Sequence, residues 1–464
     1  MPPRHSRLLR GLAVAILTLS FGMLGAPVSA RAADTTITLR TMGSAPVDLN
    51  APLGMLEALK IALARSETLR TTQIDIEVSK LDEKDVWYRM FPKLNLVATY
   101  DVPVIQNNEN NKRTYKESIN ISFSTGPYDP ISAYIGHDAS KFSVQLSELL
   151  HVIAIQEMLE KIGYAFLEVN SLDEEITARK ELVVVMEALV RYTWNKLDAG
   201  TISALDHKMA DQRLALARLE LSRAIRKREL TLQTLKQLIG LDRAEKVTFN
   251  TAMIKEQIEP NQEFDQPLDP ERLMKQNLSL QAQTLREKLE TFNVMLAQAM
   301  HIPKFAFGFR TPDPMSNQQG NLPYYASLQA SVPIWAWGET LRATDRAKMK
   351  VQKEKLSGKL LLQKVQQITE ELRAALDANA EAASIAQTKA ALQRLEVTRK
   401  EISYSAGSVP YDALVGFRET AIRAQLEAIK AQQTLSEARL NMKIVTGSLI
   451  AEHVRVRYVE LEKN

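Results

Sequence analysis

Hydrophobic residues recur at spacings of three and four along the C-terminal part of the chain. Ten positions continue this pattern from Leu414 to Val445. They are Leu414, Phe417, Ala421, Ala424, Ala428, Ala431, Leu435, Ala438, Met442 and Val445. An apolar residue at every third or fourth position is typical of a coiled-coil seam. The spacing therefore predicts a long helix that packs along one side.

The same pattern occurs 207 residues earlier. Subtracting 207 from the ten positions gives His207, Ala210, Leu214, Ala217, Leu221, Ala224, Arg228, Thr231, Leu235 and Leu238, which is largely the same stripe. The two stripes end at Gly240 and Gly447, and glycine suits the left-handed residue that terminates many helices. Self-similarity at a fixed spacing indicates a structural repeat. The chain is therefore predicted to contain two copies of one plan.

A glycine-containing turn precedes each stripe. The turns are Ala199, Gly200, Thr201 and Ile202 in the first copy and Ala406, Gly407, Ser408 and Val409 in the second, with 406 − 199 = 207. Before them, residues 132–197 and 340–404 continue the same spacing without a proline. About 65 residues at ~1.5 Å each form a helix of about 100 Å. An ordinary globular helix bundle, the alternative, would have shorter helices.

Two pairs of alternating segments lie in front of the long hairpins. The first pair covers about residues 93–103 and 115–124, and the second covers about 304–311 and 324–333. Apolar and polar side chains alternate along each segment. This alternation is typical of strands in a membrane β-barrel, but half-buried strands of a soluble sheet have the same pattern.

The number of strands bears on the oligomeric state. Four strands cannot close a barrel, because the smallest bacterial outer-membrane barrels use about eight. Three copies would supply 4 × 3 = 12 strands and leave a polar lumen, whereas two would give a barrel filled by side chains. The predicted fold class is therefore mainly α with a β-barrel part. Two tandem repeats of a strand pair and a long coiled-coil hairpin would trimerise into a 12-stranded β-barrel on an α-helical barrel.

The N-terminal segment has the order of a secretory signal. Three arginines precede an apolar run at residues 11–24, and small residues follow around Ala30 and Ala32. This order is typical of a cleavable signal peptide, which we predict to cover residues 1–32. The apolar run is shorter than the ~20 residues that a membrane-spanning helix needs. The mature protein is therefore expected to be exported.

Removal of this segment changes the charge balance. Four of the 59 Lys and Arg residues are Arg4, Arg7, Arg10 and Arg31, so 59 − 4 = 55 remain against 55 Asp and Glu. A neutral mature chain lacks the basic surplus of a nucleic-acid-binding protein, and no nucleic acid is expected as a partner. The chain has no cysteine, which excludes disulfides, thiolate metal sites and thiol nucleophiles.

No group of residues points to catalysis. The six histidines are His5, His137, His151, His207, His301 and His453. None of them forms a metal-binding spacing, and phosphate-binding, dinucleotide-binding and nucleophile-elbow motifs are absent from the sequence. We therefore expect no enzyme activity, no catalytic residue, no cofactor and no metal. The basic run Arg223, Arg226, Lys227 and Arg228 is interpreted as a solvated helix face. The alternative for Arg228, which occupies a seam position, is that it lines the interior of the assembly or pairs across it.

Several segments resemble the TolC family of outer-membrane efflux proteins. Residues 55–63 resemble the family's opening helix, and FPKLNL from Phe91 and IPKFAF from Ile302 resemble its strand-opening prolines. SVPIWAWGETLRA from Ser331 resembles its last strand and the continuation into the third long helix. The resemblance implies a passive exit duct of a tripartite efflux or type I secretion system. This duct would cross the outer membrane of a Gram-negative bacterium and extend into the periplasm.

The resemblance also implies partners and domains. The chain would form a homotrimer in outer-membrane lipid and work with a periplasmic adaptor and an inner-membrane transporter. The eight turn residues, 199–202 and 406–409, would dock the adaptor. Besides the signal peptide, the implied domains are a first repeat at 33–240, an equatorial segment at 241–270, a second repeat at 271–447 and a C-terminal equatorial tail at 448–464.

Closed ducts of this family carry rings of aspartates near the tip. Asp206 and Asp412 lie six and five residues past the turn glycines (206 − 200 = 6 and 412 − 407 = 5). In a trimer, each could form a periplasmic gate ring of three carboxylates that binds cations. The match is incomplete, because Gly416 stands where some relatives have a second aspartate. Solvated carboxylates on a helix face are the alternative.

Two other functions are weighed against the duct. A periplasmic coiled-coil adaptor or scaffold without a pore would carry one helical hairpin, whereas this sequence predicts two, each preceded by a strand pair. A periplasmic hydrolase has no supporting group of residues. The sequence does not identify the cargo, the particular adaptor or the particular transporter.

Overall fold

The computed structural model describes residues 51–449 apart from several gaps. The gaps are residues 90, 92, 102–117, 126, 252–253, 255–269, 311–323 and 333–336. The predicted signal peptide, most of the predicted equatorial segment and the tail beyond residue 449 therefore lie outside the described residues. The residues that the structure describes belong to a single compact unit within Ser44–His453.

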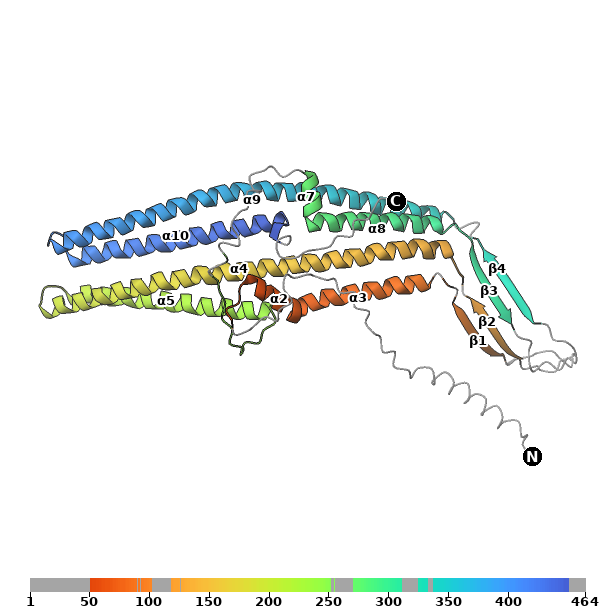
Figure 1. Cartoon of the computed structure of the whole chain (residues 1–464), viewed down its shortest axis with the longest axis horizontal. Helices are drawn as coiled ribbons and strands as arrows, with labels where there is room; N and C mark the ends of the chain where they lie inside the picture. Colours follow the sequence, from red (N-terminus) through yellow and green to blue (C-terminus); the bar gives the residue numbers. More distant parts are fainter. Residues whose placement is uncertain are drawn as a thin grey trace, which may run out of the picture. The chain divides into compact units, whose positions relative to one another are not determined.

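Two sets of elements follow one another with the same plan (Figure 1). The first set is α2 (Met55–Arg65), α3 (Glu67–Tyr88), β1 (Leu94–Asp101), β2 (Ser118–Thr125), α4 (Pro130–Asp198) and α5 (Ala204–Leu238). The second set is α7 (Pro270–Gln276), α8 (Leu278–Ala299), β3 (Lys304–Arg310), β4 (Tyr325–Ser331), α9 (Glu339–Ser405) and α10 (Tyr411–Val445). The mainly α fold class, with two strand pairs and two long helical hairpins, is confirmed. The helix pair α7–α8 was not predicted from the apolar spacing.

Local sequence explains where the long helix α4 begins. Asp129 is its N-cap, and its carboxylate accepts a hydrogen bond from Ser132 N at 3.0 Å. Pro130 follows at the first helical position, where the missing N–H costs nothing because that group has no helical partner. The helix then continues for 69 residues, and its counterpart α9 has 67. At ~1.5 Å per residue both are about 100 Å long.

The four strands form one antiparallel sheet in the order β1-β2-β3-β4. Its register aligns Leu96 with Phe123, and Phe123 with Phe309. The neighbouring row aligns Ser124 with both Asn95 and Gly308. Because adjacent residues of a strand point to opposite faces, one face is apolar and the other polar, as the alternation predicts. In the described residues, the outer edges of β1 and β4 have no strand partner.

The helices form layers that are four elements wide. Beside the strands, the order of contact is α3-α4-α8-α9, and toward the turns it is α5-α4-α10-α9. Figure 1 shows α4 running along α3 and then along α5. Burial follows this order, because α4 buries 23 residues whereas α9, of almost equal length, buries six. Thus α4 is an interior helix, and α3, α5 and α9 are edges.

None of the described helices combines the length and the apolar character required to cross a membrane.

Contacts between the two repeats centre on α4. Phe142 of α4 packs on Phe292 of α8 with ring centroids 5.3 Å apart. Further along, a Cβ added at Gly163 would come within 3.0 Å of Leu440 of α10, so these two helices lie close together. Gln156 donates a hydrogen bond to the backbone oxygen of Ile444 at 2.9 Å. The repeats therefore form one packed unit.

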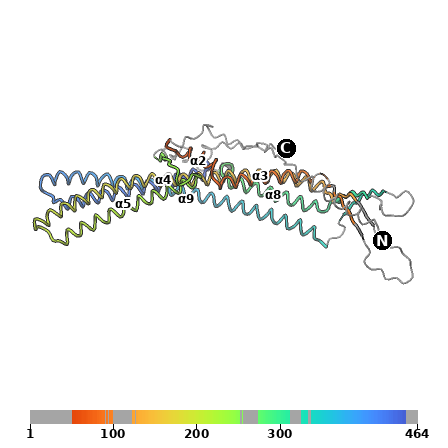
Figure 2. The backbone as a smooth tube through the Cα atoms, turned by 90° about the horizontal axis from the view of Figure 1, so that it is seen from below, coloured from red at the N-terminus to blue at the C-terminus, as the bar shows by residue number. Residues whose placement is uncertain are grey.

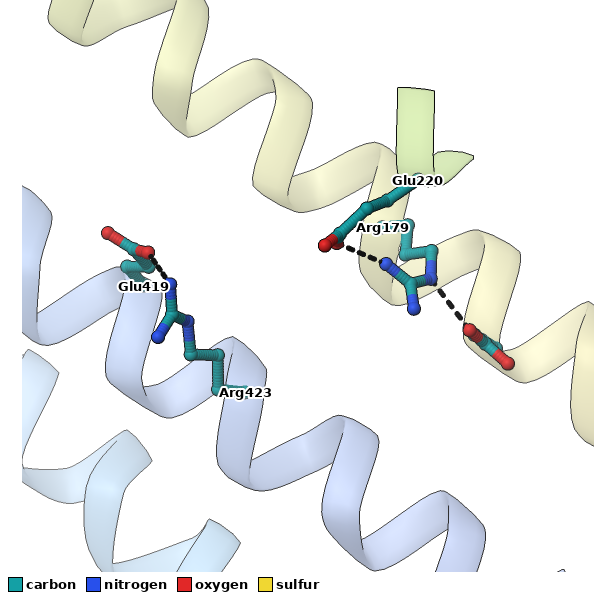
Figure 3. A network of polar contacts seen from close by, with 5 residues as sticks. Arg179, Glu220, Glu419 and Arg423 are labelled. Atoms are coloured by element: carbon teal, nitrogen blue, oxygen red, sulfur yellow. Dashed lines mark hydrogen bonds and ion pairs between the residues drawn. The ribbon is translucent and has the colours of Figure 1, made fainter. Parts of the chain in front are cut away.

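Ion pairs join α4 to α5. Arg179 lies between Glu175 of its own helix and Glu220 of α5 (Figure 3). Burial opposes its charge, but the hydrogen bonds and charges of the two carboxylates raise the pKa of Arg179 above its usual value. Arg218 of α5 binds Glu187 of α4 at 2.8 Å. These pairs favour one register of the hairpin, since a shift would separate opposite charges.

A buried histidine between α3 and α4 predicts a pH dependence of stability. The Nδ1 atom of His151 lies 2.7 Å from the Thr72 hydroxyl, and burial lowers the pKa of His151. The unfolded chain then binds the proton more readily than the folded chain, so this stabilisation is present above about pH 6.5 and is lost as the pH falls.

We expect acidification from pH 7.5 to 5.5 to lower the free energy of unfolding through this residue by on the order of 1 kcal/mol. Urea titrations at both pH values measure the effect. His151→Gln should show a smaller pH difference than the unsubstituted protein, and an equal difference would contradict the prediction.

Candidate functional site

The two hairpin turns have the same backbone structure. Gly200 and Gly407 have φ angles of 69° and 75°, in the left-handed region that favours glycine. Thr201 N donates to Lys196 O at 2.9 Å, and Ser408 N donates to Ser403 O at 3.0 Å. These six-to-one hydrogen bonds define a Schellman motif. Both turns lie at the same end of the described unit, at the left in Figures 1 and 2, and the sheet lies at the other end in Figure 1.

The returning helices begin differently. Ser203 caps α5, and the Asp206 carboxylate accepts hydrogen bonds from Ser203 N at 3.2 Å and Ser203 Oγ at 2.8 Å. Such a capping box satisfies two helix N–H groups. Helix α10 instead starts after Pro410, without a side-chain cap, and Asp412 lies in its first turn. Asp206 therefore has a structural role that Asp412 lacks.

Aromatic rings connect the two hairpins just before the turns. Tyr192 of α4 packs on Tyr411 of α10 with ring centroids 4.6 Å apart, and Tyr404 of α9 lies 5.7 Å from Tyr411. Lys196 Nζ sits 4.8 Å from the centre of the Tyr192 ring. Contacts of this kind stabilise beyond simple burial. The tips of one chain are therefore coupled to each other.

Both candidate gate aspartates line one cavity of about 310 Å³ at this end. Tyr192, Lys196, Met209 and Arg213 are among the other lining residues. A hydrogen bond to Tyr192 raises the pKa of Lys196, and the charge of Asp412 contributes to the same shift. The cavity therefore contains two acidic and two basic side chains, rather than carboxylates alone.

The sequence predicted part of this site. It identified the eight turn residues and the two aspartates, which the structure brings to the same end. It did not reveal Tyr192, Lys196, Tyr404 or Tyr411. The contact between Tyr192 and Tyr411 joins residues that lie 219 positions apart (411 − 192 = 219). The sequence did contain one local indication of these residues, because Tyr404 and Tyr411 lie close to the turn glycine Gly407.

The described residues include histidine and carboxylate side chains, the groups that could bind a metal ion together. Among those residues, no group of three or more histidine or carboxylate side chains could hold a metal ion.

The match to a known protein family covers the first repeat. Residues 58–241, which run from α2 to the end of α5, match the family model described as outer membrane efflux protein. The first repeat therefore carries the sequence pattern of this family. The second repeat reproduces the plan of the matched residues, as the shared order of elements indicates. No curated protein is significantly similar to the chain in sequence.

Solved structures share the fold of this chain over most of its length. A membrane protein from Pseudomonas aeruginosa has a TM-score of 0.72 at 16% identity, over 87% of this chain and 95% of that one. The CmeC outer membrane channel of Campylobacter jejuni has a TM-score of 0.72 at 15% identity, over 88% and 90%. The MtrE outer membrane channel of Neisseria gonorrhoeae, in its open state, has a TM-score of 0.69 at 16% identity, over 88% and 94%.

Proposed function

We propose that three copies of the chain form a passive exit duct of a tripartite efflux or type I secretion system, across the periplasm and the outer membrane. The observation that carries this proposal is that apolar faces are uncovered at both edges of the described chain. They occur on the helices near the turns and on the helices beside the sheet, and the outer strands also lack partners. Contacts between the two repeats inside one chain indicate what those edges would bind.

The helices near the turns give the first indication. Ala178 and Val185 of α4 pack in a cluster with Val415 and Ile422 of α10. Their counterparts in the second repeat are Ile385 and Leu392 of α9 (178 + 207 = 385 and 185 + 207 = 392). Both of these are exposed. The same face is therefore buried in the first repeat and uncovered in the second.

The opposite edge has a matching surface. Leu426 of α10 packs against the same cluster, and its counterpart in the first repeat is Leu219 of α5 (426 − 207 = 219). Leu219 is 64% exposed. If α9 of one copy met α5 of the next, the contact would reproduce the packing of α4 on α10.

The helices beside the sheet, α3 and α8, and the strands also have exposed counterparts of the contacts between the repeats. Leu280 and Leu69 are buried counterparts in α8 and α3 (280 − 69 = 211). The same offset relates Phe292, which packs on α4, to the exposed Leu81 of α3 (292 − 81 = 211). In the sheet, pairing of β4 with β1 of the next copy would reproduce the pairing of β2 with β3.

Edges of this kind favour a closed ring. Each copy would use two different surfaces, which generates a ring when the rotation closes. Three copies would align twelve strands (4 × 3 = 12), with the apolar row of Leu96, Phe123 and Phe309 toward lipid. The proposed localisation is the outer membrane, reached after cleavage of the predicted signal peptide. No chemical step is needed, because a duct only conducts.

The hairpin turns are proposed to dock the periplasmic adaptor, which would connect the duct to an inner-membrane transporter. In both turns, a Cβ at the turn glycine would meet nothing within 4 Å, so a partner could approach the backbone.

Of the two gate candidates, Asp412 is the better supported, because the Asp206 carboxylate caps α5. An adaptor or scaffold without a pore is less well supported, since it would leave the exposed strand edges unexplained.

Membrane fractionation and planar-bilayer conductance test this proposal. The full-length protein is expected in the outer-membrane fraction as a detergent-resistant trimer. It should conduct ions across a bilayer once the tip is opened, for example by Tyr411→Ala, which removes the ring between Tyr192 and Tyr404. Tyr411→Phe is the matched control, because it keeps the ring. A soluble monomer that never conducts would overturn the proposal.

A further inference from the structure

A second cavity lies where the helices meet the sheet. It has a volume of about 650 Å³ and is lined by the end of α3, the start of α4 and Leu296 of α8. Phe91 and Tyr128 provide aromatic surface, and Val86 provides aliphatic surface. Cavities of this size and character bind small organic ligands. None of the residues that carry the proposed contacts between copies or the hairpin tips lines this cavity.

Two positive charges stand at this cavity without acidic partners. Arg89 and Lys93 both line it, and neither forms an ion pair within the described part of the chain. The lining also contains Asp129, but its carboxylate accepts hydrogen bonds from Ser132 N at 3.0 Å and Ser132 Oγ at 2.6 Å. These hydrogen bonds hold the carboxylate at the start of α4, and its negative charge together with the positive charges of Arg89 and Lys93 leaves the lining with a net positive charge. The cavity is suited to an anion attached to an apolar group.

The surroundings indicate which anion. Trp87, Tyr88, Phe91 and Tyr134 are all exposed around the junction of α3, α4 and the sheet. Exposed aromatic side chains are enriched where a protein passes from water into a membrane. On the proposed function, this junction would lie at the periplasmic surface of the outer membrane, where phospholipid headgroups are located.

We propose that this cavity binds the phosphate-bearing headgroup of an anionic phospholipid, with Arg89 and Lys93 as the phosphate-binding side chains. The acyl chains would extend along the exposed aromatic residues into the membrane. This proposal rests on the proposed function for the position of the membrane. It adds a lipid site that anchors the duct at the level where α3 ends.

Native mass spectrometry of the full-length protein in detergent tests the site. Phosphatidylglycerol is titrated against the unsubstituted protein and against Arg89→Gln, Lys93→Gln and the double variant. A cation near an anionic lipid surface contributes about fivefold in affinity, so each single variant should bind about fivefold more weakly and the double variant roughly 25-fold. Arg70→Gln and Lys84→Gln are matched controls, because both residues are exposed on α3 and do not line the cavity.

The outcomes separate the two proposals. Equal lipid affinity of the double variant and the controls would overturn the lipid site, as would inorganic phosphate binding as tightly as the lipid. Arg89→Lys keeps the charge and should bind within about twofold of the unsubstituted protein, because an ammonium group also binds phosphate as a point charge. If the glutamine variants fail to fold, the comparison of lipid with inorganic phosphate on the unsubstituted protein serves as the test. The double variant should still fractionate with the outer membrane and conduct. Failure of the unsubstituted protein to do so would instead overturn the duct.

Discussion

Replacing Leu219 with glutamate is expected to abolish the oligomer while leaving the helices of each chain formed. Leu219 is exposed on α5, and its counterpart Leu426 packs in the contact between the repeats. Burying one leucine stabilises by about 2 kcal/mol, so three interfaces lose about 6 kcal/mol per trimer (3 × 2). A carboxylate buried without a partner costs several kcal/mol more. Detergent-resistant trimer on gels and size-exclusion chromatography measure the loss.

Two companion variants decide whether this effect reports an interface. Leu219→Met conserves volume and apolar character, and it should assemble normally. Leu392→Glu alters the opposite edge, α9, and should abolish the oligomer as completely as Leu219→Glu. Far-UV circular dichroism should give the same helix content for all three. Normal trimers of both glutamate variants would contradict the proposed ring.

The second large effect is expected at Gly240, and Gly407 provides its control. Both residues have a φ angle of 75°, so alanine at either costs about 1–2 kcal/mol from the left-handed backbone alone. At Gly407 the added Cβ would meet nothing within 4 Å, whereas at Gly240 it would lie 2.7 Å from the backbone oxygen of Arg65. The backbone must move to relieve this overlap, which adds about 1–3 kcal/mol.

Urea unfolding followed by circular dichroism measures the difference. We expect Gly407→Ala to lower the free energy of unfolding by about 1–2 kcal/mol and Gly240→Ala by about 2–5 kcal/mol. Gly447→Ala should resemble Gly240→Ala, because its Cβ would lie 2.6 Å from the backbone oxygen of Gln276. Equal losses of stability for Gly240→Ala and Gly407→Ala would contradict the prediction. They would show that the close approach of α2 to the end of α5 adds nothing to the cost of alanine at Gly240.

The glycine positions illustrate what local pattern can predict. The offset of 207 residues placed Gly240 and Gly447 at the ends of two seams, and both have the left-handed φ that the sequence predicts. The seam of α10 is buried at Leu414, Ala421 and Leu435. Alternation along the strands likewise predicted one apolar and one polar face, which the register bears out. These features depend on helix and strand periodicity, which neighbouring residues encode.

Contacts between distant segments could not be predicted in this way. The Tyr192–Tyr411 contact joins helices from different repeats. The cavity that contains Arg89 and Lys93 requires the ends of α3 and α8 to meet the start of α4. No sequence motif marks either contact. Side-chain packing tolerates many different apolar residues, so the sequence of one segment does not identify the segment that packs against it.

By itself, the sequence determined the two repeats, their long helices, the strand faces, the turn glycines and the family resemblance, because each of these is written in periodic or local residue patterns. Only the tertiary structure decided that α4 and α10 are interior helices while α3, α5 and α9 are edges. The repeat alone would make α4 equivalent to α9 and α5 equivalent to α10. Their burial differs because, among the described elements, each outer helix has a neighbouring helix on one side only.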